Sequence, residues 1–83
     1  MPQTSENIER VINVRDIDPR HRHGIIDRLF EQLEPQRSLQ LVVDHDPRPL
    51  RYQLDARHGA RCSWSYLEQG PDVWRVRLQY LRD

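Results

Sequence analysis

The sequence predicts an α/β fold of the α+β kind, a two-layer sandwich in which a four-stranded mixed sheet carries two helices on one face. The chain has 83 residues, enough for a single domain. Its periodic segments follow the order βαβαββ, since two segments have helical spacing and four have the apolar runs or the alternation of strands. Two helices on one face of such a sheet give two layers.

The first strand and the first helix follow a polar start. We expect residues 1–9 to form a flexible tail and residues 10–83 to form the single domain. Val11–Val14 predicts a short strand. Between Pro19 and Leu33 the apolar residues share one helical face: Ile25, Ile26, Leu29, Phe30 and Leu33. The residues expected in solvent on the opposite face are Arg22, Asp27, Arg28, Glu31 and Gln32.

Both predicted helices begin at an Asp-Pro pair. Asp18 and Asp46 are expected to be N-caps, because a carboxylate there accepts a hydrogen bond from a free helical amide. The proline that follows each of them suits the first helical turn. The second helix is predicted from residue 47 to residue 57, and Gly59 suits the left-handed position that follows it. Between the helices, the apolar run Leu39–Val43 predicts a central strand.

Two strands complete the chain, predicted at Arg61–Leu67 and Val73–Leu81 with a turn at residues 68–72. In the last strand apolar and polar residues alternate strictly, a pattern typical of a sheet with one buried face and one solvated face. This alternation assigns the aromatic residues to the core instead of to a base-stacking platform. It also puts Arg75 and Arg77 on the open face.

Composition narrows the function classes. The chain has 13 basic residues, all arginine, and 13 acidic residues, and this neutral total disfavours nucleic acid as the main partner. Cys62 is the only cysteine, so no internal disulfide forms. No apolar run reaches the about 18 residues of a transmembrane helix, and the first residues lack the features of a signal peptide. We therefore expect a cytoplasmic protein without a membrane contact.

Four stretches carry a resemblance to a known family: Asn13-Val14-Arg15, Asp44-His45-Asp46-Pro47-Arg48-Pro49-Leu50, Trp64-Ser65-Tyr66-Leu67-Glu68-Gln69-Gly70-Pro71 and Trp74-Arg75-Val76. Over residues 11–80 the chain resembles the bacterial family catalogued as domain of unknown function 2249. The resemblance implies a fold similar to that of the TusA/SirA-like sulfur carriers. Some relatives are joined to hemerythrin-like domains, which implies a link to iron, oxygen or nitric oxide physiology.

The sulfur-carrier mechanism does not transfer with the fold. In those carriers a Cys-Pro pair begins the first helix, and its cysteine bears the persulfide. The matching position here is Pro19, or Asp18 if the alignment shifts by one residue, and neither side chain can hold sulfur. Likeness of fold alone does not imply function. Sulfur relay through Cys62 is a weaker alternative, because a cysteine on the core face of a strand is usually an apolar filler.

The two helix starts and the 68–72 turn are expected to meet at one edge of the sheet. The candidate ligand-binding residues of this rim are Arg15, Arg20, Asp44, His45, Asp46, Arg48 and Glu68. Arginines beside two helix N-termini form a receptor for a small anion. The structural alternative is that the aspartates cap the helices while Arg15 or Arg48 pairs with Asp44.

Three histidines suggest a metal site as a further alternative. Imidazoles of His21, His23 and His45 are ligands suited to zinc, iron or copper. Residues two apart on a helix do not share a face, so this site requires a non-helical segment before Gly24. His58, next to a glycine turn, is interpreted as structural, because a positive imidazole suits a helix C-terminus.

No motif of a known catalytic site occurs: the chain lacks a G-x-G-x-x-G stretch, a P-loop, a CxxC pair and a nucleophile elbow. We therefore expect a non-enzymatic accessory domain; the sequence requires no cofactor and leaves a metal ion possible. It would bind a protein partner or a small anionic ligand at the rim formed by residues 15–21, 44–48 and 68–72. The alternative from another class is a metal- or redox-linked protein that uses the three histidines.

Overall fold

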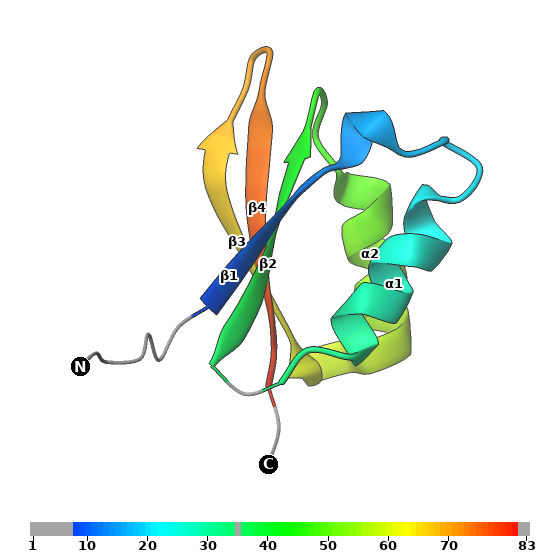
Figure 1. The fold of residues 1–83 in the computed structure, drawn as a ribbon, viewed down its shortest axis with the longest axis vertical. Helices are drawn as coiled ribbons and strands as arrows, with labels where there is room; N and C mark the ends of the chain where they lie inside the picture. The colour runs from blue at the N-terminus through cyan, green and yellow to red at the C-terminus, as the bar shows by residue number, and fades with distance from the viewer. Residues whose placement is uncertain (1–7, 35, 82–83) are drawn as a thin grey trace.

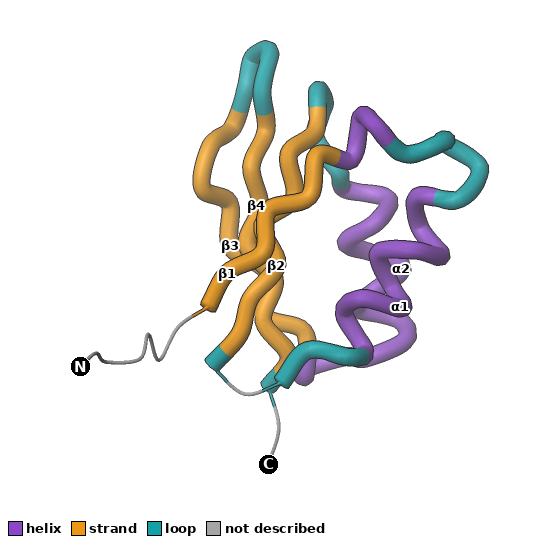
Figure 2. Tube along the Cα trace, in the orientation of Figure 1, coloured by secondary structure: helices purple, strands orange, loops and turns teal. Residues whose placement is uncertain are grey.

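A four-stranded sheet is covered on one face by two helices in the computed structural model, which describes residues 8–34 and 36–81 (Figures 1 and 2). The strands are β1 (Ile8–Asn13), β2 (Arg37–Val43), β3 (Cys62–Gln69) and β4 (Trp74–Tyr80). The helices are α1 (Arg22–Glu31) and α2 (Arg48–His58), and two short 3₁₀ turns are η1 (Val14–Asp16) and η2 (Gly59–Arg61). The predicted fold class and element order are confirmed.

The sheet has the strand order β1-β2-β4-β3. β1 and β2 are parallel, and β4 runs antiparallel to both of its neighbours, β2 and β3. The carboxyl ends of β1, β2 and β3 therefore lie at the same edge of the sheet, the upper edge in Figure 1. Both helices begin near this edge, which is where ligands usually bind to sheets with parallel strands.

The core lies between the sheet and the two helices. Phe30 of α1 and Leu54 of α2 are fully buried, and they pack with Leu41, Val76 and Leu78 of the central strands β2 and β4. This confirms the interpretation of the β4 alternation and the predicted apolar face of α1, except that Ile25, at 40% exposure, faces solvent. Because Phe30 is fully buried, its truncation to alanine would remove about 3–5 kcal/mol of stability. Such a loss is large for a small domain with a modest core.

The first strand begins earlier than predicted. β1 starts at Ile8, so residues 8 and 9, which we had assigned to the flexible tail, belong to the sheet. The reason is that Glu9 faces the open side of the sheet, where Ser38, Gln40 and Arg77 donate hydrogen bonds to its carboxylate. The polarity that suggested a tail is the polarity of a solvated sheet face. Residues 1–7 lie outside the described part of the chain.

Helix α1 begins later than predicted, because Asp18 and Pro19 form a turn instead of the first helical residues. The Asp18 Oδ1 atom accepts a hydrogen bond from the Arg20 amide at 3.0 Å, and the His21 amide donates to the Asp18 carbonyl at 2.8 Å. The N-cap position belongs to His21. The prediction that Asp18 caps the helix is therefore wrong, since its carboxylate caps a turn that precedes α1.

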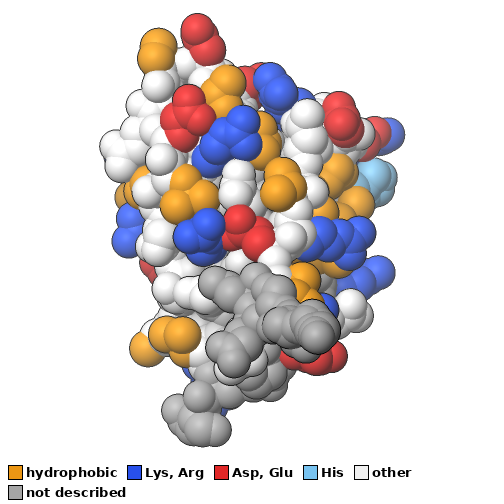
Figure 3. All heavy atoms as spheres, turned by 60° about the vertical axis from the view of Figure 1, so that its left-hand side comes forward, with side chains coloured by type: hydrophobic (Ala, Val, Ile, Leu, Met, Phe, Trp, Pro, Cys, Tyr) orange, Lys and Arg blue, Asp and Glu red, His pale blue; other side chains and the backbone are white. Residues whose placement is uncertain are grey.

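The open face of the sheet carries charged side chains that pair with one another, with hydrophobic side chains among them (Figure 3). Arg75 donates to Glu68 at 3.0 Å and to Gln40 at 3.1 Å, and Arg77 bonds to Glu9 with two nitrogens. This places Arg75 and Arg77 on the open face as predicted. A chain of hydrogen bonds thus connects all four strands. Within residues 8–34 and 36–81, neither helix is long and apolar enough to cross a membrane.

Candidate functional site

A cleft of about 160 Å³ opens between the first turns of α1 and α2 and the carboxyl ends of β1 and β2. Its lining comes from η1, α1, β2, α2 and the loops between them: Val14, Pro19, Arg22, His23, Ile26, Val43, His45, Pro47, Pro49 and Leu50. A cavity of roughly 150 Å³ accommodates a molecule of the size of benzene. The predicted meeting of both helix starts at one sheet edge therefore produces a hollow of ligand size.

Apolar groups form most of the cleft, and three polar side chains are placed around them. Val14, Ile26 and Val43 are nearly fully buried and belong to the core. Arg22 and His23 stand at the first turn of α1, and His45 follows the end of β2. An apolar pocket with a few convergent polar groups is the usual form of a small-molecule site.

Arg22 fixes the loop that joins η1 to α1. Its Nε donates to the Ile17 carbonyl at 2.8 Å, and one terminal nitrogen reaches the Arg15 carbonyl at 3.5 Å. The prediction that Arg22 faces solvent away from the core side is wrong, because α1 begins at this residue and the preceding loop folds back over it. The sequence feature that could have indicated this role is a basic residue directly before His23, at the start of a helix.

His45 is held by its neighbour Asp44. The His45 Nδ1 lies 2.7 Å from Asp44 Oδ1, and both side chains are more than half exposed. This hydrogen bond lowers the pKa of the Asp44 carboxyl, and the charge of Arg22 adds to the effect. Asp44 therefore stays ionised at neutral pH and orients the imidazole that lines the cleft.

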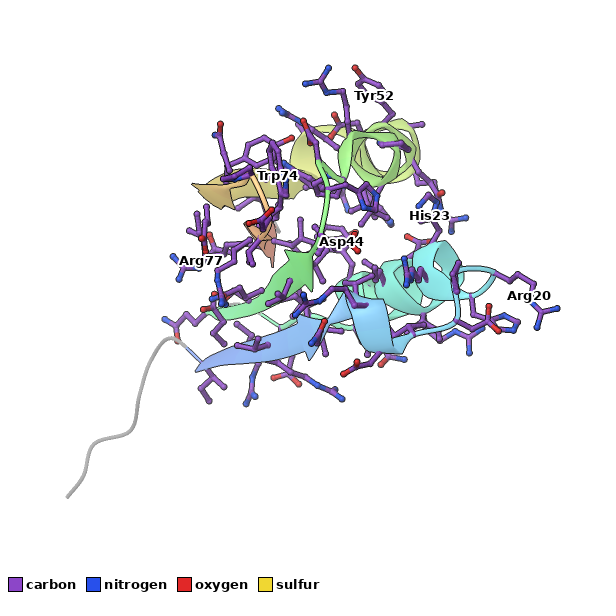
Figure 4. All side chains as sticks on the ribbon, turned by 90° about the horizontal axis from the view of Figure 1, so that it is seen from above. Arg20, His23, Asp44, Tyr52, Trp74 and Arg77 are labelled. Carbon is purple, nitrogen blue, oxygen red and sulfur yellow. The ribbon has the colours of Figure 1, made fainter. Side chains whose placement is uncertain are left out.

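His23 is held by a residue of the other helix. Its Nδ1 lies 2.8 Å from Gln53 Oε1, so the contact joins α1 to α2 (Figure 4). His21, in contrast, lies on a different surface hollow with Arg20 and Arg28. The structure thus brings His23 and His45 to one cleft and leaves His21 outside it, as residues two apart at the start of a helix point in different directions.

Asp46 connects the start of α2 to the sheet instead of capping the helix. The N-cap position of α2 belongs to Pro47, and no side chain among the described residues caps it. The Asp46 carboxylate accepts from the Tyr66 hydroxyl at 2.8 Å and from Arg48 at 3.1 Å. The capping prediction for Asp46 is wrong, because a proline between it and the helix moves the carboxylate out of reach of the first amides.

The remaining predicted rim residues make local contacts away from the cleft lining. Arg15 donates to Asn13 Oδ1 at 3.1 Å. Arg20 pairs with Asp18 at 3.2 Å and points outward from the α1 loop (Figure 4). Glu68 pairs with Arg75 on the open face. Fewer of the predicted rim residues line the cleft than expected. Of these residues, His45 lines the cleft, and Asp44 supports it.

A second cluster of polar groups joins the two helices away from the cleft. Asp27, predicted in solvent, is buried, and its carboxylate lies 2.8 Å from His58 Nε2 and 2.9 Å from Arg57 Nε. Arg57 also lies 3.4 Å from Glu31. The ligand atoms of Asp27, Glu31 and His58 are within 4.8 Å of one another, a spacing compatible with a metal ion. Arg57 already pairs with both carboxylates, so we interpret the cluster as a structural bridge.

Cys62 lies on the helix-facing side of β3 and is half-buried. Burial, followed by the charge of Asp55, raises the pKa of its thiol to about 11. At neutral pH the thiolate, which is the reactive form, is therefore scarce. This environment is the opposite of the one that activates a sulfur-carrying cysteine.

The fold and the cleft define a class: a small α+β sandwich domain with a ligand-sized hollow at the carboxyl edge of its sheet. The model of one protein family, described as an uncharacterized conserved protein (DUF2249), matches residues 11–79, and the chain belongs to this family. The resemblance drawn from the sequence motifs is thus confirmed, while the likeness to sulfur carriers stays a prediction. No curated protein and no solved structure matches the chain.

Proposed function

We propose that this protein is a non-enzymatic accessory module that binds a small anionic ligand with an apolar body in the cleft between α1 and α2. The observation that carries this proposal is the make-up of the cleft, an apolar floor of ligand size beside the permanent cation Arg22. An apolar body fits the floor, and a carboxylate or other oxyanion fits the guanidinium, which binds such groups with parallel hydrogen bonds.

The helix starts add to the attraction for an anion. α1 and α2 both begin at the cleft, and among the described residues no side chain caps either N-terminus. The first amides of a helix then present free donors and the positive end of the helix dipole. Asp44 offsets part of this positive potential. We therefore expect affinity for simple anions in the millimolar to micromolar range, about −4 to −8 kcal/mol.

The lining supports binding rather than catalysis. It contains no serine, threonine or cysteine that could act as a nucleophile, and no carboxylate lies in it. Its histidines have no hydroxyl or thiol partner to activate. An acidic side chain of a protein partner offers the same chemistry as a free anion, and it is the second outcome of the test below.

A cytoplasmic location is part of the proposal, and a lone unpaired cysteine suits a reducing compartment.

An NMR titration with simple anions tests the proposal. Acetate, benzoate and phosphate are added in turn to the ¹⁵N-labelled protein. We expect saturable shifts at the amides of Arg22, His23 and His45, with benzoate binding more tightly than acetate because its ring fills the apolar floor.

Two arginine variants give the matched comparison. Arg22→Gln removes the cleft cation, and we expect at least a fivefold loss of benzoate affinity, about 1 kcal/mol. Arg28→Gln, on the other hollow of α1, should leave binding unchanged. Because Arg22 also holds a loop carbonyl, the spectrum of its variant must show the native fold, and His45→Ala is the second probe. Shifts that persist in both cleft variants contradict the proposal, and binding of acidic peptides alone replaces the free ligand by a protein partner.

A further inference from the structure

We infer that the cleft also holds a transition-metal ion, bound by Nε2 of His23 and Nε2 of His45. This inference goes beyond the anionic ligand and does not require it. It rests on three observations: both rings line the same cleft, both are anchored through Nδ1, and the other nitrogen of each ring has no partner among the residues that the structure describes.

The anchoring of the two rings is the arrangement that metal-binding histidines use. The Nδ1 of His45 lies 2.7 Å from an Asp44 carboxylate oxygen, and the Nδ1 of His23 lies 2.8 Å from the Gln53 side-chain oxygen. In metal sites the imidazole that binds through one nitrogen usually donates its other N–H to a carboxylate or a carbonyl oxygen. Such a partner fixes the ring orientation and raises the basicity of the free nitrogen.

The hydrogen-bond partners also define which nitrogen carries the lone pair. The Asp44 carboxylate oxygen 2.7 Å away is a hydrogen-bond acceptor, so His45 donates from Nδ1. The side-chain oxygen of Gln53 imposes the same tautomer on His23. In the neutral rings Nε2 then carries the lone pair. Within residues 8–34 and 36–81, Nε2 of neither ring has a hydrogen-bond partner.

The two ligands come from different elements that are tied to each other. His23 is on α1 (Figure 4) and bonds to α2, and by the element order His45 stands in the link from β2 to α2. Two imidazoles suit zinc and copper among the common metals. Two protein ligands leave open positions for water or for an anion, as in sites that exchange a ligand, whereas structural zinc sites are closed by four protein ligands.

The other groups that could bind a metal are weaker choices. Asp27, Glu31 and His58 have a compatible spacing, but both oxygens of Asp27 already accept hydrogen bonds from Arg57 and His58. His21 lies on a separate hollow. The predicted set of three histidines is therefore reduced to two for this proposal, and His21 becomes the internal control.

Zinc alone, added to the metal-free protein without coordinating buffer, is the probe. Calorimetry is expected to show one equivalent bound, and long-range ¹H–¹⁵N spectra are expected to show the Nε2 signals of His23 and His45 moving while their Nδ1 signals stay those of N–H. His23→Ala and His45→Ala should each weaken zinc binding at least tenfold, and His21→Ala should change it less than twofold.

The supporting residues give a second, milder test. Asp44→Ala and Gln53→Ala leave both ligand nitrogens in place, and loss of such a partner lowers metal affinity by about 10–100-fold. A purely structural role of the two hydrogen bonds would change stability and leave zinc binding as it is. Retention of native affinity in both variants would overturn the inference.

Three outcomes would contradict it directly: no saturable zinc binding, zinc-induced shifts centred on His58 or Cys62, or equal effects of all three histidine variants. The outcome is separable from that of the anion proposal. If benzoate binds the metal-free protein and zinc does not bind, only the metal inference fails. If zinc binds and no anion binds with or without it, the proposed function fails and the metal site stands.

Discussion

At the scale of single residues, Asp27 is a buried charged group that joins the two helices. Its buried carboxylate accepts from two cationic or polar side chains of α2, Arg57 and His58. The rings of Phe30 and Tyr80 lie 4.9 Å and 5.8 Å from the His58 imidazole. Removing one partner of such a cluster leaves the others buried and unpaired, which is more harmful than the loss of a surface pair.

We predict that Asp27→Ala lowers the free energy of unfolding by about 2 kcal/mol, less than a fully buried pair because Arg57 is half exposed. Urea denaturation followed by circular dichroism measures the change. Asp55→Ala is the control, since its ion pair with Arg51 lies on the surface at 4.0 Å. Equal losses of unfolding free energy in the two variants would show that burial of Asp27 contributes nothing to stability.

Cys62 gives a prediction that depends on pH. Burial raises its pKa from 9.0 to about 11 in the folded chain. The unfolded chain therefore loses this proton first as the pH rises, so the contribution to stability is complete below pH 9 and is lost between about pH 9 and 11. We expect Cys62→Ala to flatten the fall in unfolding free energy over this range.

Thiol labelling checks the same environment. The native protein should react slowly with a disulfide reagent at pH 8 and at once after unfolding in urea, because only the thiolate reacts. Fast labelling of the folded protein would mean that the thiol is accessible and ionised, and it would return sulfur relay to consideration.

At the scale of elements, glycines at two positions act in opposite ways. Gly24 lies within α1, and a Cβ built there meets no atom within 4 Å. Gly70 has a φ of 72° in the turn between β3 and β4, and a Cβ there would lie 3.0 Å from the Trp74 indole. Gly24 thus lowers the helix propensity of α1 although there is space for a side chain. Gly70, in contrast, is required by its positive φ and by the indole ring beside it.

We predict that Gly24→Ala stabilises the protein by about 0.8–1 kcal/mol, which raises the melting temperature by about 4–8 °C in a domain of this size. Gly70→Ala should destabilise it, since both the positive φ and the indole oppose a side chain. Thermal denaturation of the two variants in parallel measures both. A rise in melting temperature for Gly70→Ala would contradict the geometry of the turn.

The four strands and the two α-helices could be predicted from the sequence, but the two 3₁₀ turns and the helix starts could not. The periodic apolar residues determine which face of a helix is buried, so α1 and α2 were found. The Asp-Pro pairs suggested caps, and an aspartate before proline is equally able to form a turn with its own backbone. Only the path of the chain after Pro19 and Pro47 decides between the two.

At the scale of the whole molecule, the hydrogen-bond network of the open face connects residues far apart in sequence. Glu9 of β1 and Arg77 of β4 meet across β2, because the sheet order places β2 between them. The hydrogen bond from Arg77 lowers the pKa of the Glu9 carboxyl, with additions from Ser38 and Gln40. A folded-state pKa below the ordinary one means that folding is stabilised by the ionised group.

We predict that this contribution is present above pH 4.5, the ordinary pKa of Glu9, and is lost as the pH falls through its lower folded value. Glu9→Gln should reduce the stability at pH 7 and make the decline in acid less steep. Urea denaturation at a series of pH values measures both effects. The exposed Glu34, paired with Arg37 at 3.7 Å, is the control position, and an identical acid slope in both glutamine variants would contradict the role of Glu9.

The sheet edge at which the cleft lies could be predicted from the sequence, but few of the residues that line the cleft could. The carboxyl edge follows from the order of elements, and His45 was placed there because it follows a strand. Arg22 and Gln53 were not predicted: the contacts of Arg22 depend on how the loop before α1 folds back, and the contact of Gln53 depends on how α1 packs beside α2. No local pattern in the sequence gives the distance between two helices, and the strand order β1-β2-β4-β3 likewise depends on long-range pairing.

Two polar contacts join the helices at different points along their length, and the two contacts differ in strength. Asp27 with Arg57 and His58 joins them by a buried cluster, whereas His23 with Gln53 joins them beside the cleft by one exposed hydrogen bond. Such a bond contributes only about 1 kcal/mol. We therefore expect the two helices to separate more easily beside the cleft than at the Asp27 cluster, so that the cleft widens in thermal motion while the core stays closed. Its amides should exchange hydrogen with solvent before those around Phe30.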